Sequence, residues 1–542
     1  MSTSPLKHTR RLKRALPLLV LPLILGPALC PQSARAASTD IVPRGSGLLD
    51  AFATLAQANA FGAEDTPEDF LGEPLYTRGQ LAQLLEHLIA DDPKRFAAVT
   101  GDDRANTALH TAVSDLKPEL TYDNADLVAL NVTPPGKAAV SGYIQPELRL
   151  RTGGDKNPGI GVLGVYRVTV QGNLRSNLRY SVVGSNWAQD RRRVFNQDVG
   201  AHDFSGLSEA ALMLDGGRGL TVTLGRLPVR WGPGYRGATL VSDNAPPLDQ
   251  LQVAFPFSLG ARLGRAYNFT QLVATFREGG TRKYFAARRI EYKFNSRLSV
   301  DFQEAYKSSA SKSLYVSLLP DFYTGQSANL KIGSLRLNGL DQNYNGFLNF
   351  GAAYAANPNT RFYGQFGIDD LQSPGHQSFR TPRKIAYLVG TTFRPAPGTD
   401  AVAEYSFADA TTYTSRIVET QWQKGLYNNI GLPAGPNSRE VFLRVRQKIG
   451  RGLHVALEGR DRRRRDDSFP EPTSRDYAAT VEFAPNQKNG FEVTYHDYRQ
   501  TAFPISPTVP LPGDGFTPTN AEGNYGQNLR IRQLDLAYRL FF

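Results

Sequence analysis

Apolar and polar residues alternate with a period of two from about residue 137 to the C-terminus. In residues 140–151, side chains such as Val140, Ile144 and Leu148 fall on one side, and mostly polar or charged side chains fall on the other. The same alternation returns in 164–172, 288–294, 297–303, 401–407, 440–447, 476–483 and 490–498. Segments of about ten residues with one apolar and one polar face predict antiparallel strands, whether of a soluble sandwich or of a membrane β-barrel.

The C-terminal strand distinguishes these two alternatives. Leu534, Leu536, Tyr538 and Leu540 occupy every second position, and the chain ends on the aromatic Phe542. A soluble sheet more often blunts such an apolar edge with polar residues. The ending resembles the signal that outer-membrane barrels present to the barrel-assembly machinery. We therefore expect a mainly β protein, a large antiparallel transmembrane β-barrel, with outer-membrane lipid and that machinery, through Phe542, as partners.

A helical period precedes the strands. Apolar residues recur at helical spacing after residue 47, and a second amphipathic segment begins at Thr77, with Gln80 three positions later. Thr77 and Gln80 have the spacing of a capping box. A third segment over 108–116 repeats the pattern. The sequence predicts a small N-terminal α-helical module over residues 37–130, placed on the periplasmic side, followed by the barrel over residues 131–542.

The first 36 residues have the pattern of a secretory signal peptide. Basic residues precede a short apolar run interrupted by Pro17, Pro22 and Pro27, and a small-residue cleavage pattern ends at Ala36. A retained N-terminal anchor is the alternative. Residues 1–36 contain six basic and no acidic residues, so removing them lowers the formal charge from +12 to 56 − 50 = +6. Cys30, the one cysteine of the chain, leaves with this segment. We expect export to the outer membrane.

Composition and motifs exclude several classes of function. Much of the basic charge belongs to the targeting segment, so we expect no nucleic-acid partner. The mature chain has no thiolate ligand, and its six histidines are scattered without metal-binding spacing. Neither a nucleophile elbow nor a phosphate-binding loop occurs. We therefore expect no metal, no cofactor, no catalytic residues and no enzymatic activity, although a site assembled from distant strands stays open at this point.

Length gives the size of the barrel. About 406 residues follow the helical module, which corresponds to roughly 16–20 strands, with an even number expected. A barrel this wide leaves a bore that its own wall side chains do not fill. If the protein is not an open pore, another part of the chain must occupy the bore.

Residues 228–250 are the candidate for that role. Glycine and proline recur through this stretch, so it does not form a central strand. Long loops are usually functional or disordered, and aromatic and aliphatic residues argue against disorder. We expect an inward-folded loop, with an ordinary surface loop as the alternative. The candidate plug or ligand-binding residues are Arg226, Arg230, Trp231, Tyr235, Arg236, Asp243 and Asn244.

The same stretch carries a family resemblance. Gly225-Arg226, the run Arg230-Trp231-Gly232-Pro233-Gly234, Leu240 and Asn244-Ala245-Pro246 resemble the core motif of the Wzi-type capsule-assembly family. The segment PLYTRGQLAQLL (74–85) is similar to the start of that family. The resemblance implies an occluded barrel of about 18 strands with an N-terminal helical bundle, acting as a lectin-like anchor for exported polysaccharide.

A dense basic run adds a second candidate site. It lies between acidic residues, in what we expect to be a turn, and consists of Arg462, Arg463, Arg464 and Arg465. Arginine suits acidic polysaccharide or lipopolysaccharide phosphates, and a solvated or lumen-neutralised loop is the alternative. The functional hypothesis is an anchor or organiser of exported polysaccharide. The alternatives are a porin for small anionic or sugar solutes and, less favoured, a barrel enzyme.

Overall fold

The structure is a computed structural model of the chain. It describes residues 42–542, apart from 43–46, 62–69, 71–75, 133–138, 154–158, 187–204, 218–219, 243–246, 259–265, 279–280, 295–296, 309–343, 370–383, 410–411, 414–430, 465–472, 502–528 and single residues at 118, 121, 123, 176, 358, 397, 451 and 487. The predicted signal peptide over residues 1–36 lies outside the described residues. No helix in the described part of the chain has the length and apolar character needed to cross a membrane.

Helices occupy the N-terminal part of the chain. They are α2 Gly47–Gln57, α4 Arg78–Asp91, α5 Pro93–Gly101, α6 Asp103–Leu116 and α7 Asn124–Ala129. The capping box expected before α4 is present: the Gln80 backbone N–H donates to Thr77 Oγ1 at 3.3 Å, and the Thr77 N–H donates to Gln80 Oε1 at 2.9 Å. Helix α6 begins five residues before the predicted 108, because the Asp102 carboxylate caps it by accepting the Ala105 N–H at 2.7 Å.

One apolar cluster holds the helices together. Leu49, Phe52 and Leu55 of α2 pack with apolar residues of α4 and α6, and all three are buried. Phe52 also stacks on Phe61 with ring centroids 5.4 Å apart. The helical faces that the apolar period predicted are therefore the faces that are buried.

Eighteen antiparallel strands follow, each paired with its neighbours in the chain, and β1 pairs with both β2 and β18, which closes the sheet. The strands are β1 Ala139–Gly153, β2 Gly159–Arg175, β3 Leu178–Asn186, β4 Ser205–Gly217, β5 Leu220–Leu227, β6 Leu248–Ser258, β7 Ala266–Glu278, β8 Thr281–Lys293, β9 Leu298–Ser308, β10 Tyr344–Asn357, β11 Thr360–Ile368, β12 Ile385–Phe393, β13 Thr399–Ala408, β14 Ser438–Lys448, β15 Leu453–Arg464, β16 Thr473–Asn486, β17 Asn489–Gln500 and β18 Leu529–Phe541. The predicted fold class, a closed barrel of about 18 antiparallel strands, is confirmed.

The two faces of the wall differ in polarity. Side chains such as Ile144, Leu443 and Leu457 are half or more exposed on the outside, whereas Gln145, Glu147 and other polar residues point inward and are buried. This is the reverse of a soluble globule, in which exposed faces are polar. The alternation in the sequence thus corresponds to an apolar outer surface and a charged inner wall.

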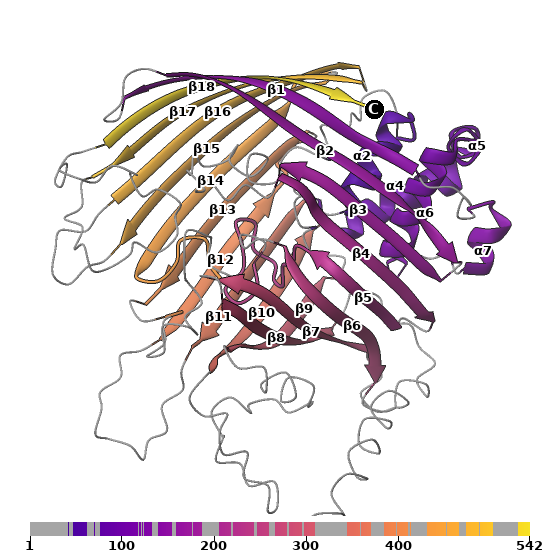
Figure 1. The fold of residues 1–542 in the computed structure, drawn as a ribbon, viewed down its shortest axis with the longest axis horizontal. Helices are drawn as coiled ribbons and strands as arrows, with labels where there is room; N and C mark the ends of the chain where they lie inside the picture. Colours follow the sequence, from indigo (N-terminus) through magenta and orange to yellow (C-terminus); the bar gives the residue numbers. More distant parts are fainter. Residues whose placement is uncertain are drawn as a thin grey trace, which may run out of the picture.

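The two ends of the barrel also differ. The C-terminus and the helices lie at the same end, as Figure 1 shows. The connections that follow even-numbered strands at this end are short, such as 176–177 and 487–488, whereas connections at the other end include 187–204, 309–343, 409–437 and 501–528. We call these the helix end and the long-loop end.

Helix α6 is fixed to the barrel by an arginine of β3. The Arg179 guanidinium lies 2.5 Å from Asp115 Oδ1 and donates to the Thr111 carbonyl at 3.1 Å. His110 lies beside these groups. Burial, together with the positive charge of Arg179, lowers the pKa of His110 to about 4, and the carboxylate of Asp115 only partly opposes this shift.

We expect docking of the helices to weaken as the pH falls. The pKa of His110 in the folded module lies below its value in the unfolded module. At pH values between the two, His110 is therefore protonated in the unfolded module and neutral in the folded module. The contribution of His110 to stability is fully present above about pH 6.5 and is lost between about pH 6.5 and pH 4, by about 3 kcal/mol in all. Limited proteolysis of the helices in detergent, measured across this pH range, tests the prediction.

His110→Gln should reduce this pH dependence, because the replaced side chain does not titrate. His87→Gln is the matched control: His87 lies on α4 with an exposed side chain. An equal pH response in His110→Gln and the unmodified protein would contradict the account.

Candidate functional site: the segment that crosses the bore

Residues 228–242 leave β5 at the long-loop end and form a compact segment, which we call the inner loop. Trp231 and Val241 form an isolated antiparallel bridge, with the Trp231 N–H donating to the Val241 carbonyl at 2.9 Å. Strand β6 begins at Leu248, so the predicted loop over 228–250 was too long at its C-terminal side. The physical reason is that Leu248 already pairs with Leu227 and Asp249 with Arg226 of β5, so the strand ladder begins before residue 250.

Glycine at 232 allows the inner loop to approach the wall. Gly232 has φ of +146°, and a Cβ there would lie 2.2 Å from the Gln365 amide nitrogen of β11. Arg230 acts within the loop, because its guanidinium donates to the carbonyls of Gly234 at 3.2 Å and Tyr235 at 3.3 Å. Both features bring the backbone of the loop against the inner wall.

Polar side chains of β9, β10 and β11 hold the inner loop near its beginning, at Trp231, and near its end, at Thr239. The Trp231 carbonyl accepts from the amides of Gln303 at 3.4 Å and Gln365 at 3.1 Å. The Thr239 N–H donates to Gln365 Oε1 at 3.0 Å, and the Thr239 hydroxyl contacts Asn349. Gln365 therefore bridges two points of the loop.

A single carboxylate holds the tip of the inner loop. Glu404 of β13 is buried and accepts the backbone N–H groups of Tyr235 at 2.7 Å and Arg236 at 3.2 Å. It also accepts the Tyr363 hydroxyl at 2.9 Å. Two consecutive backbone N–H groups that converge on one anion form a strong anchor.

Ion pairs continue this anchor onto β14 and β15. Glu440 lies between Arg236 of the inner loop, at 3.5 Å, and Arg462 of the wall, at 2.8 Å. Arg444 donates to the Tyr235 hydroxyl at 2.9 Å. The three acidic and basic wall residues are all buried, so each depends on its partners for charge compensation.

Apolar stacking accompanies these polar contacts. The Tyr235 ring stacks on Phe442 with centroids 5.6 Å apart and planes 19° apart. The Arg236 guanidinium lies over the same Phe442 ring at 5.0 Å. Phe442 thus separates and supports the two side chains at the loop tip.

A second connection packs on the inner loop. Tyr413, from the connection between β13 and β14, donates its hydroxyl to the Thr239 carbonyl at 2.6 Å and stacks on Phe347 at 5.3 Å. Its backbone N–H donates to Asp369 at 2.5 Å. Burial raises the pKa of Tyr413, so the hydroxyl stays protonated and remains a donor.

The partners of the inner loop lie across the barrel from its origin. The loop starts between β5 and β6, and its tip contacts β13 and β14, which lie about half the ring away. Figure 1 shows this segment inside the cylinder. The chain therefore crosses the bore and joins two opposite parts of the wall.

The predicted site residues fall into separate groups. Trp231, Tyr235 and Arg236 meet on the inner wall as described, and Arg230 closes the loop on itself. Arg226 instead forms a bidentate pair with Asp249 of β6, at 2.6 and 2.9 Å, away from the inner loop. Asp243 and Asn244 lie outside the described residues.

The basic run does not form the predicted turn. Residues 462–464 belong to β15, and Arg465 lies outside the described residues. Strand geometry sends successive side chains to opposite faces, so Arg462 points inward to Glu440 while Arg463 is exposed beside Asp461. The run is therefore two sites and not one basic cluster.

Sequence reasoning missed the wall residues that receive the loop. Glu404, Glu440 and Gln365 lie in regular strands and carry no motif of their own. Their one signal is the inward register, which each shares with the buried positions of its strand. Only the closed barrel brings them to residues that lie more than a hundred positions away in the sequence.

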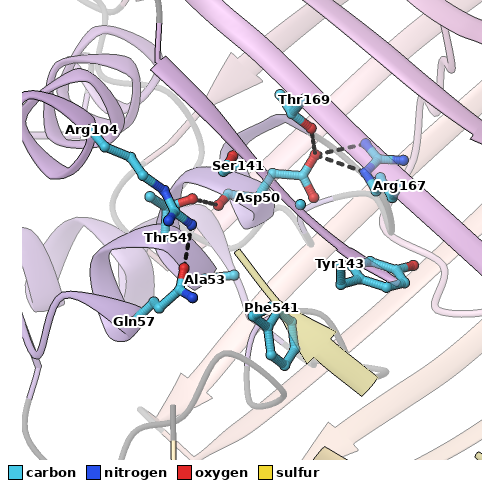
Figure 2. Close-up of a pocket in the computed structure, with 11 residues that line it drawn as sticks. Asp50, Ala53, Thr54, Gln57, Arg104, Ser141, Tyr143, Arg167, Thr169 and Phe541 are labelled. Carbon is cyan, nitrogen blue, oxygen red and sulfur yellow. Dashed lines mark hydrogen bonds and ion pairs between the residues drawn. The ribbon is translucent and has the colours of Figure 1, made fainter. Parts of the chain in front are cut away.

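Helix α2 makes a second interior contact, at the helix end. The Asp50 carboxylate accepts from Arg167 Nε at 3.0 Å and Nη2 at 2.7 Å, and it lies 3.5 Å from the Thr169 hydroxyl. Figure 2 shows Asp50 pointing to these residues of β2, with Tyr143 and Phe541 beside them. Asp50 and Arg167 are both buried, so α2 is fixed to the inner wall by a charged pair.

No metal centre is evident within the described parts of the chain, where no group of three or more potential ligands is placed to hold an ion. The charged residues of the bore serve instead as mutual partners.

Comparison with known proteins finds likeness in structure alone. No protein-family model and no curated protein matches the chain by sequence. The structure is similar to Wzi of Escherichia coli, an outer-membrane protein involved in group 1 capsule assembly and described as a carbohydrate-binding β-barrel. The two share 12% identity, and the match covers 92% of this chain and 99% of Wzi with a TM-score of 0.50.

Two barrels of Pseudomonas aeruginosa match more weakly. OccK9 (OpdG) shares 13% identity over 75% of this chain and 99% of its own, with a TM-score of 0.41. OpdO shares 12% identity over 76% and 98%, with a TM-score of 0.42. The likeness to Wzi shows that the chain has the fold of an outer-membrane barrel with its N-terminal helices included.

Glu404→Ala should release the inner loop. The change leaves two buried backbone N–H groups and the Tyr363 hydroxyl without their acceptor, at a cost of about 3 kcal/mol. We expect faster proteolysis within residues 228–242 of the folded, detergent-solubilised barrel. Asp400→Ala on the same strand is the matched control, because Asp400 pairs with Arg394 at the helix end. Equal proteolysis in Glu404→Ala and the control would contradict the anchor.

Asp50→Ala should detach helix α2. It removes the main partner of the buried Arg167, which then keeps Glu209 at 3.6 Å, and the expected cost is about 3 kcal/mol. Asp91→Ala is the control, since Asp91 forms an exposed pair with His87. Hydrogen exchange of α2 should increase in Asp50→Ala and stay unchanged in Asp91→Ala. Unchanged exchange in both proteins would show that the pair does not hold the helix.

Proposed function

We propose that the protein is an outer-membrane barrel, obstructed by its own chain, that anchors or organises exported polysaccharide at the cell surface without turning it over. The inner loop carries this proposal. Buried ion pairs and hydrogen bonds hold this loop across the bore. A wide diffusion pore needs no such obstruction.

Placement in the outer membrane is supported by the outer surface and by the closure of the sheet. Apolar side chains cover the outside of the strands. Pairing of β1 with both β2 and β18 leaves no open sheet edge to face lipid. The predicted export signal is consistent with this placement, and the helical module then faces the periplasm.

Polysaccharide binding is supported by the likeness to Wzi in overall layout. Wzi is described as a carbohydrate-binding barrel of capsule assembly, and the structural match covers 92% of this chain and 99% of Wzi. The long-loop end would then face the cell exterior, as long connections do in such barrels. An anchor at this end needs loops that bind sugar and a bore that does not leak.

A porin is the second candidate, and the charged inner wall favours it. Arg444, Arg446, Arg460 and Arg539 are buried on the inward face of the strands. Rings of arginine select anions in pores. A loop that narrows a channel without closing it would leave a path for small anionic or sugar solutes.

An enzymatic role has less support. The inward-facing His496 lies 3.8 Å from Asp476, an arrangement that nucleophilic catalysis can use. Within the described residues, however, no hydroxyl or thiol is hydrogen-bonded to His496. The proposal therefore assigns this pair to the polar network of the wall.

Deletion of the gene tests the anchor. We expect cell-bound polysaccharide to fall several-fold while released polysaccharide rises and the total stays constant, because attachment and not synthesis is lost. Complementation with the unmodified protein should restore the cell-bound share. An unchanged partition after deletion would exclude the anchoring role.

Conductance separates the anchor from the porin. In planar bilayers the unmodified protein should conduct little, because the inner loop occupies the bore, and Glu404→Ala should conduct more. Asp400→Ala again serves as the control. Steady, anion-selective channels from the unmodified protein would favour the porin.

A further inference from the structure

The outer surface carries a group of arginines near the long-loop end. They lie on the last residues of β15 and β17 and the first residues of β16 and β18. We call them the arginine row, which consists of Arg463, Arg475, Arg499, Arg530 and Arg532. Each is exposed and belongs to the outward face of its strand.

The register brings these side chains together. Arg475 of β16 is the direct partner of Arg499 of β17, which is the direct partner of Arg530 of β18. Like charges in directly opposed positions destabilise a sheet. Three successive arginines on one face therefore need anions to compensate them.

Two aspartates supply part of this compensation. Asp461 lies 3.0 Å from Arg475 and 3.3 Å from Arg463. Asp497 lies 2.9 Å from Arg499 and 2.5 Å from Arg530. Five arginines and two aspartates leave three positive charges in excess.

The aspartates also orient the guanidinium groups. The Asp497 side chain is 12% exposed, whereas Arg499 and Arg530 are 52% and 43% exposed. The Asp497 carboxylate accepts hydrogen bonds from both of these arginines, from Arg499 Nη2 and from Arg530 Nε. Guanidinium groups held from behind in this way keep further donors directed outward, where they suit a multidentate anion.

The height of the row on the wall suggests which anion it meets. Tyr477 and Tyr495 are exposed on the same outward face and lie closer to the middle of the barrel, two residues along β16 from Arg475 and four residues along β17 from Arg499. Leu457, Val493 and Leu536 continue this face toward the helix end. Tyrosine marks the boundary between apolar chains and headgroups in membranes. The arginine row thus lies at the level of the headgroups.

We propose that the arginine row binds the phosphate groups of an anionic lipid in the leaflet at the long-loop end. Basic residues just above an apolar belt attract anionic headgroups, and arginine binds phosphate through paired donors. The inference rests on the proposed membrane placement and is independent of the polysaccharide role. An acidic polysaccharide held by the loops would instead meet groups above the strands.

The test uses the full-length mature protein in zwitterionic detergent and native mass spectrometry. The probes are diphosphorylated lipid A, the same lipid without its phosphates, inorganic phosphate and an acidic polysaccharide. We expect preferential retention of the phosphorylated lipid. Arg475→Gln/Arg499→Gln should weaken it about tenfold or more, since two charge-assisted phosphate contacts are lost.

The variant is chosen so that each aspartate keeps one arginine: Arg463 for Asp461 and Arg530 for Asp497. Lys94→Gln/Lys488→Gln is the matched control, because it removes two exposed charges at the helix end. It should retain lipid as the unmodified protein does. Heat-modifiable migration on a gel reports folding of both variants.

Three results would overturn the inference. The first is equal retention of phosphorylated and dephosphorylated lipid A by the unmodified protein. The second is an equal loss of lipid retention in the arginine variant and in the lysine control. The third is binding of polysaccharide or free phosphate at the arginine row with no preference for the lipid. The first comparison needs no variant. Membrane fractionation separately tests the placement, so failure of lipid binding is distinguishable from failure of the proposed location.

Discussion

Buried polar groups must have partners, and in this barrel the inner loop and the wall supply them to each other. The carboxylate of Glu404 accepts two consecutive backbone N–H groups of the loop, and Glu440 compensates Arg236 and Arg462 together. Without the loop, Glu404 and Gln365 would lose the backbone groups that they bind, and Glu440 would keep Arg462 but lose Arg236. Without these side chains, the loop backbone would lose its acceptors and donors. The position of the loop follows from this mutual dependence.

The need of buried polar groups for partners also explains how the contacts differ along the barrel axis. At the helix end, Asp50 brings α2 against Arg167, so the helical module is joined to the wall by a buried charge pair. Within the bore, the inner loop binds polar side chains of the wall, among them Glu404, Gln365 and Glu440. At the outer surface, aspartates compensate only part of the arginine row. The two interior contacts suit a protein that stays closed, while the outer surface retains charge for the membrane around it.

The sequence predicted what depends on local period and missed what depends on closure. Alternation gave the strands, the capping box placed the start of α4, and Gly232 with its neighbours marked the inner loop. Glu404 and Asp50 had no local signal, because their partners lie far away in the chain. The prediction of a turn at the basic run 462–465 was wrong because it rested on charge composition. Pairing of β15 with β14 and β16 continues through Arg463, so this part of the run is strand. The alternation of the strand then separates Arg462 from Arg463.

The most direct test of the central claim is a cross-link between the inner loop and strand β10 of the inner wall. Thr239 and Asn349 are in side-chain contact, and mature protein that has lost Cys30 would contain no competing thiol. Thr239→Cys/Asn349→Cys should form an intramolecular cross-link with a short thiol reagent in the folded, membrane-embedded protein, and either single variant should not. Absence of the cross-link in the folded Thr239→Cys/Asn349→Cys protein would contradict a loop that is held inside the bore.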